Sequence, residues 1–122
     1  MSFHFDVLDP LLEKAAELRA VFHLDAVDRD KQGGRPLEQI RILKESGLPS
    51  AQIAKAYGGQ GASWLTILRI VREFAKTDAS LAHLFGYHHL PLNLILFRGS
   101  NAQKDRWLSG SAAGNWIWSN SG

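Results

Sequence analysis

The residues most able to do chemistry in this sequence are three histidines within the apolar stretch 83–90. His83 and Tyr87 are four residues apart, so on a helix their rings would meet side by side. His88 falls instead on the apolar seam of the same helix. Imidazole rings in such a setting can serve a cofactor pocket, but hydrogen-bonded core histidines have the same spacing. Spacing alone leaves both interpretations open.

A metal centre is not predicted. The histidines do not combine with a carboxylate on one helix face, and His88 and His89 point in different directions. The chain contains no cysteine, which excludes disulfides, thiolate metal ligands and a cysteine nucleophile. This composition fits a reducing cytoplasm. The histidines therefore favour a cofactor pocket over a metal site.

A glycine-rich turn, Tyr57-Gly58-Gly59-Gln60-Gly61, precedes the most apolar helix of the chain. Glycines let main-chain N–H groups approach an anion, so this turn could cradle a phosphate. It lacks the lysine and the spacing of a P-loop, however, and it does not follow a strand as a dinucleotide fingerprint does. The pattern favours a simple connector.

Two other functions stay open on the residues alone: a helix-turn-helix DNA-binding domain and a non-catalytic helical interaction module. Residues 50–58 followed by 63–73 fit a helix-turn-helix, with Arg69 and Arg72 on the second helix. Trp64 stands there where polar, base-reading side chains are needed. The net charge of +2, from 14 basic and 12 acidic residues, gives too weak an electrostatic field to indicate DNA binding. No nucleic-acid partner is therefore expected.

The elements that must position these residues are predicted to be helices. The 122 residues suffice for one domain with one core, and apolar residues recur at helical spacing. We expect an all-α bundle of about five helices with a C-terminal strand stub. No segment has the length of a membrane span and no signal peptide is visible, so no membrane partner is expected. Cap residues and glycines delimit helices at about 9–31, 36–46, 63–76, 78–97 and 100–108, followed by a turn at 110–114 and a strand-like run at 116–120.

Several ordered segments carry a resemblance to a known family. They are Leu43-Lys44-Glu45-Ser46-Gly47-Leu48, Tyr57-Gly58-Gly59-Gln60-Gly61, Arg72-Glu73-Phe74-Ala75-Lys76-Thr77-Asp78-Ala79-Ser80-Leu81 and Gln103-Lys104-Asp105-Arg106-Trp107-Leu108. From Arg29 onward the chain resembles the N-terminal helical domain of the acyl-CoA dehydrogenase superfamily. Residues 83–88 and 115–120 are most similar to its flavin-dependent monooxygenase branch. That branch includes the dibenzothiophene monooxygenases and related sulfur-acquisition oxidoreductases.

The resemblance implies a cofactor and roles for individual residues. The cofactor would be reduced FMN supplied by a partner flavin reductase, and the co-substrate oxygen, acting on a small organosulfur compound. His83 matches the catalytic histidine that stabilises the flavin once it has reacted with oxygen. Tyr87 and His88 match substrate-binding positions, and Asn120 matches the asparagine at the flavin edge. Trp118 and Ser119 directly precede it and are expected to bind the cofactor with it.

The resemblance also implies further parts of the protein. Residues 1–114 would form the N-terminal helical domain, and residues 115–122 the start of a middle β domain. The chain would then be one wall of a flavin site, with an exposed apolar patch around Trp107, Trp116 and Trp118. Family members are commonly homotetramers. A cytoplasmic location is expected for this protein. The alternative within the superfamily is part of an acyl-CoA dehydrogenase that uses FAD.

Overall fold

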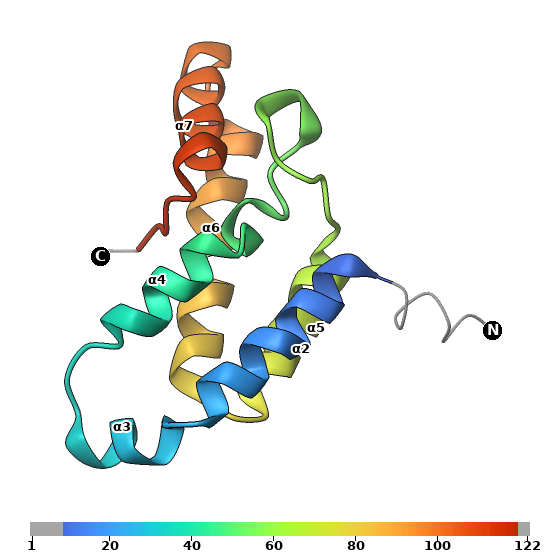
Figure 1. Cartoon of the computed structure of the whole chain (residues 1–122). Coiled ribbons are helices and arrows are strands. Elements are labelled where there is room, and N and C mark those ends of the chain that lie inside the picture. Colours follow the sequence, from blue (N-terminus) through green and yellow to red (C-terminus); the bar gives the residue numbers. More distant parts are fainter. Residues whose placement is uncertain (1–8, 120–122) are drawn as a thin grey trace.

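The computed structural model describes residues 9–119, and every regular element in that range is helical (Figure 1). The prediction of an all-α domain is confirmed. The α-helices are α2 (Pro10–His23), α3 (Ala26–Gln32), α4 (Leu37–Glu45), α5 (Trp64–Ala75), α6 (Ala79–Arg98) and α7 (Asn101–Gly114). Two short 3-10 turns, η1 (Leu48–Ser50) and η2 (Lys55–Tyr57), connect α4 to α5.

The interior is built around α5 and α6, as the apolar pattern predicts. Figure 1 shows α2 and α5 side by side, with α7 beside the C-terminal part of α6. The centre holds three phenylalanines, Phe22, Phe74 and Phe85, each 0% exposed. Their rings meet edge to face, with centroids 5.5 Å apart for Phe22 and Phe74 and 5.4 Å for Phe74 and Phe85. This cluster joins α2, α5 and α6 into one core.

The helix starts follow from their cap residues. Ser63 accepts a hydrogen bond from the N–H of Thr66, and Asp78 accepts one from Leu81. Ser100 forms a reciprocal capping box with Gln103 at the start of α7. Each cap satisfies a main-chain N–H that lacks a partner within its helix. These starts were correctly predicted from the sequence.

The expectation of one helix over 9–31 is wrong. The chain breaks between α2 and α3 at Leu24 and Asp25, where Asp25 has φ −128° and ψ 13°. The Asp25 carboxylate accepts hydrogen bonds from the Nε of Arg29 and from Gln39. Arg29 in turn pairs with Asp78, the N-cap residue of α6. The break therefore turns α3 so that Arg29 reaches a residue far along the sequence.

The predicted end of the last helix is also wrong, since α7 continues through 110–114 instead of ending near Leu108. It stops at Asn115, which has φ 48°. Residues 116–119 that follow have no strand structure, so the expected strand stub is absent from the residues that the structure describes. Its last predicted residue, Asn120, lies outside the described residues.

The segment between α4 and α5 contains no first helix of a helix-turn-helix. It holds only η1 and η2, and α5 buries Ile67 and Phe74 in the core. The main-chain N–H groups of Gly58, Gly59 and Gly61 all donate to main-chain carbonyls of residues 53–55. These N–H groups form their hydrogen bonds within the turn, so the glycine segment is a connector. Because the first helix of a helix-turn-helix is missing, the DNA-binding alternative has no structural basis here.

Candidate functional site

His83 and Tyr87 form an exposed aromatic pair on α6. Their rings stack with centroids 4.8 Å apart and planes inclined by 16°. Tyr87 is 44% exposed and His83 is exposed as well. Leu90 and Leu94 continue the same exposed face towards the C-terminal end of the helix. The structure thus brings together two residues that the sequence assigned to the site, and leaves both accessible.

His88 lies on the opposite, interior side of α6 and is 1% exposed. Its Nε2 is 2.7 Å from the carbonyl oxygen of Pro49, and its Nδ1 is 2.9 Å from the main-chain nitrogen of Trp118. Burial lowers the pKa of His88, although the hydrogen bond to Pro49 opposes this effect. The ring is therefore neutral at pH 7. In this arrangement His88 has no free nitrogen for a substrate, although the sequence placed it on the substrate side.

Trp118 closes the chain back onto the helices. Its indole N–H donates to the hydroxyl of Ser111 at 2.8 Å, and that hydroxyl donates to the carbonyl of Trp107 at 2.6 Å. The rings of Trp107 and Trp118 meet edge to face at 6.0 Å. Trp107 and Trp118 are partly buried, whereas Trp116 is 41% exposed and Ser119 is exposed. The expected aromatic patch is therefore only partly open.

An apolar groove of about 400 Å³ adjoins Trp118. Leu94 on its wall shares a helix face with Tyr87, so the exposed pair and the groove belong to one side of α6. Apolar walls, an indole edge and a cation at the rim are the features with which proteins hold a planar aromatic ligand. The groove can therefore accept part of a flavin or an aromatic substrate. Its lining residues are Leu94, Ile95, Arg98, Gly99, Gln103, Trp107 and Trp118.

His89 is a residue of this region that the sequence analysis did not assign. It is 0% exposed, and among the described residues neither of its ring nitrogens has a hydrogen-bond partner. Its ring packs edge to face against Phe85, at 4.8 Å, and Trp64, at 6.2 Å. Burial and the neighbouring His88 lower its pKa to about 3. The sequence signal was its spacing from Phe85, which places it on the α6 face towards α5.

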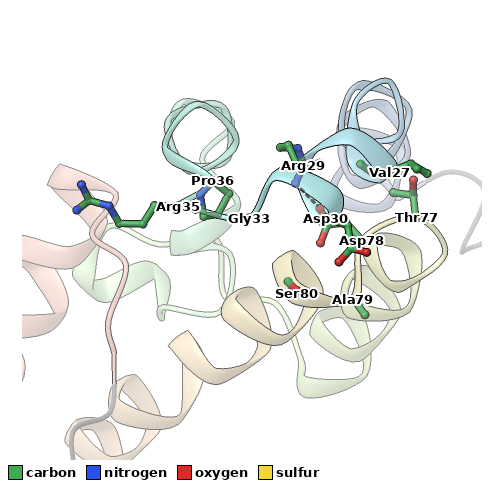
Figure 2. Close-up of a pocket in the computed structure, with 12 residues that line it drawn as sticks. Val27, Arg29, Asp30, Gly33, Arg35, Pro36, Thr77, Asp78, Ala79 and Ser80 are labelled. Carbon is green, nitrogen blue, oxygen red and sulfur yellow. Dashed lines mark hydrogen bonds and ion pairs between the residues drawn. The ribbon is translucent and has the colours of Figure 1, made fainter.

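A larger cavity of about 480 Å³ lies elsewhere, between α3 and the start of α6. Figure 2 shows Arg29 and Asp78 facing each other there, with Arg35 extended away from them. Arg29 donates to Asp78 at 2.6 Å and to the carbonyl of Phe22 at 3.0 Å. Since Asp78 is also the N-cap of α6, these groups hold helices together. None of the predicted site residues lines this cavity.

Two further observations concern residues 9–119. No group of three or more histidine, aspartate or glutamate side chains there is placed to hold a metal ion. No helix in that range is both long and apolar enough to cross a membrane. The candidate site is thus the exposed face of α6 with the groove beside Trp118, and Asn120, its predicted flavin-edge residue, lies beyond the described part.

The helix order and the packing of α5 against α6 are those of an all-helical domain. Residues 11–115 match the family described as acyl-CoA dehydrogenase, N-terminal domain. The chain belongs to this family, which confirms the resemblance seen in the sequence.

Individual relatives narrow the comparison. The chain is 43% identical over 111 residues to a probable FMNH2-dependent monooxygenase, SfnC, of Pseudomonas putida, covering 91% of this chain and 28% of that protein. It matches the structure of methanesulfinate monooxygenase MsuC from Pseudomonas fluorescens with a TM-score of 0.86 and 44% identity, over 91% of this chain and 28% of that one. It also matches TdsC from Paenibacillus sp. A11-2, solved with FMN and indole, with a TM-score of 0.86 and 35% identity, over 89% and 28%. The chain therefore spans little more than a quarter of each relative.

Proposed function

We propose that this chain is the helical part of a flavin-dependent monooxygenase that uses reduced FMN and oxygen to oxidise a small organosulfur compound. The observation that carries the proposal is the exposed stack of His83 on Tyr87, on the side of α6 that also borders the groove at Trp118. The relatives support the choice of reaction, because one is described as FMNH2-dependent and another as acting on methanesulfinate. If the His83 ring were buried and both of its nitrogens were hydrogen-bonded within the protein, it would not support this proposal.

Several residues of this chain would each have a different role in the reaction. When bound, reduced flavin supplies the electrons that activate oxygen. His83 is exposed and can donate a hydrogen bond to an oxygen atom as negative charge develops on it. Tyr87 holds the His83 ring by stacking and borders the substrate. Trp118, Ser119 and Asn120 would contact the edge of the flavin.

The same proposal includes parts beyond the described residues. Residues 1–114 would be the N-terminal helical domain, and residues from 115 onward would lead into a middle β domain that supplies other flavin contacts. A separate flavin reductase would deliver reduced FMN in the cytoplasm, and the complete enzyme would be a homotetramer. The substrate-side role of His88 would be indirect, because its ring is enclosed between Pro49 and Trp118.

The experiment uses the product of the complete reading frame, supplied with reduced FMN and ¹⁸O₂. Methanesulfinate and dibenzothiophene serve as substrates, and mass spectrometry detects the product. We expect one labelled oxygen atom in each product molecule and FMN-dependent oxygen consumption. Electron transfer from an acyl-CoA to bound FAD, without incorporation of oxygen, would instead assign the protein to the dehydrogenases. Failure to bind any flavin would reject both assignments.

A further inference from the structure

The protonation state of the His88 ring is set by its two partners. The carbonyl of Pro49 can only accept a hydrogen bond, so Nε2 of His88 must carry the proton. The main-chain N–H of Trp118 can only donate, so Nδ1 must be the bare nitrogen. Both distances, 2.7 Å and 2.9 Å, are those of well-formed bonds. His88 therefore joins η1 to the segment after α7 through a single tautomer.

Trp118 is held twice, by two different helices. Its main chain is fixed to α6 through His88, and its side chain to α7 through the hydroxyl of Ser111. The ring also packs against the small core cluster that contains Leu92 and Leu108. Residues 116–119 form no regular structure of their own. Side-chain contacts, not a ladder of main-chain hydrogen bonds, therefore decide where this segment runs.

We propose that His88 is a positioning residue, which fixes the main chain at Trp118 and thereby places the adjoining Ser119 for the flavin. The inference rests on the proposed function for its link to flavin, but the positioning itself concerns only this chain. Ser119 directly follows Trp118, so loss of the hydrogen bond from the Trp118 N–H to His88 would release the main chain that carries Ser119. His88 thus acts through Trp118 and touches neither flavin nor substrate.

Two substitutions separate the two hydrogen bonds of His88. In His88→Asn, the side-chain oxygen can take the place of Nδ1 and still accept from the Trp118 N–H. In His88→Gln, the longer side chain can place its NH₂ near the former Nε2 and donate to Pro49, but it leaves the Trp118 N–H without its acceptor. The two variants have similar polarity and burial. A difference between them therefore reports on the bond to Trp118.

The measurement is amide hydrogen exchange of the ¹⁵N-labelled 122-residue chain, followed by NMR without flavin. For His88→Gln we expect the protection of the Trp118 amide to fall about tenfold, the scale of a lost hydrogen bond. Amides of Phe85 and Leu92 should keep their protection, and His88→Asn should retain most of that at Trp118. Equal protection of Trp118 in both variants would overturn the inference. An equal loss of amide protection throughout α6 would also overturn it, because it would show that His88 only stabilises the helix.

Two further readouts keep the test decisive. In the wild-type chain, ¹⁵N chemical shifts of the His88 ring should show a protonated Nε2 and a bare Nδ1, and the opposite tautomer would overturn the inference even if both variants unfold. In the complete gene product, FMN titration should show about tenfold weaker binding for His88→Gln and recovery in His88→Asn. Equal FMN affinity in wild type and His88→Gln would refute the link to flavin. A wild-type protein that binds no flavin would refute the proposed function, while the exchange data still decide the positioning.

Discussion

The ring of Trp116 folds back over Gly110, four residues before the end of α7. A Cβ atom at Gly110 would lie 2.8 Å from Cη2 of Trp116, and one at Gly114 would lie closer still to its Nε1. Glycine is a poor helix former, yet both residues are inside the helix. Here the missing side chain makes room for an indole, which turns the chain after α7 back along the bundle.

This packing predicts a reversal in the effect of one substitution. Gly114→Ala should lower the free energy of unfolding by about 1 kcal/mol, because the added methyl group displaces Trp116. In a Trp116→Ala background the same change should raise it by about 0.5 kcal/mol, through better helix propensity. Urea unfolding of the four proteins gives the coupling between the two sites. Additive effects would mean that Trp116 does not need the glycine.

Arg29 should matter far more to stability than Arg41. Arg29 connects Asp78, Asp25 and the carbonyl of Phe22, and the Asp78 side chain is only 9% exposed. Arg29→Met would leave that carboxylate without its cation and should cost about 2 kcal/mol, reduced from a fully buried pair because Arg29 is 22% exposed.

Two controls test this reasoning on Arg29. Arg29→Lys should recover less than half of the loss, since the single ammonium nitrogen of lysine cannot replace three guanidinium nitrogens that each reach a different partner. Arg41→Met should leave the thermal midpoint nearly unchanged, because its pairs with Glu38 and Glu45 are well exposed. Similar midpoints for Arg29→Met and Arg41→Met would contradict the importance of the Arg29 network.

The buried histidines should make the chain sensitive to acid. The pKa of His89 is lowered to about 3 by burial and by His88, and the pKa of His88 is lowered by burial. In the unfolded chain the histidine pKa values are about 6.5, so between pH 6.5 and pH 3 the unfolded chain binds more protons than the folded chain. The free energy of unfolding should therefore be greatest above about pH 6.5 and decline as the pH falls towards 3.

His89→Leu isolates the contribution of His89. Leucine is of similar size and brings no unpaired nitrogen into contact with Phe85 and Trp64, so at pH 7.5 the variant should be more stable by about 1 kcal/mol. The advantage over wild type should be constant above pH 7 and widen below about pH 6. Urea unfolding across this range is the measurement. A difference that does not change with pH would show that His89 does not titrate as expected.

His83→Phe should separate oxygen consumption from product formation in the complete gene product. The residue is exposed and its ring contact is a stack on Tyr87, which phenylalanine can reproduce, so the fold should be retained. Loss of the N–H donor should reduce oxygen transfer to the substrate about 100-fold, by analogy with a deleted oxyanion donor. The electrons of reduced FMN would then appear as hydrogen peroxide. Arg41→Met, which changes exposed ion pairs of a residue that is not part of the candidate site, is the control. Unchanged product yield in a folded His83→Phe protein would remove His83 from the mechanism.

The helices and most of their starts could be predicted because their causes are local. The apolar period of 64–75 makes α5 an interior helix, and Ser63, Asp78 and Ser100 each cap the helix that follows within three residues. The family resemblance could also be found from the sequence, because it rested on short segments that occur in a fixed order along the chain. His83 and Tyr87 could be paired for the same reason, since one helical turn separates them.

Other features were decided only by the tertiary structure, because they depend on contacts between distant segments. From the sequence, Gly110 and Gly114 were predicted to lie in a turn. No local rule shows that the Trp116 ring occupies the space where their side chains would be. Asp25 likewise reads as part of one long helix until Arg29 is seen to reach Asp78. His88 looks like any histidine on an apolar seam. Its tautomer and its role are set by Pro49 and Trp118, which lie 39 and 30 residues away, and only the folded chain brings a carbonyl and an N–H to its two nitrogens.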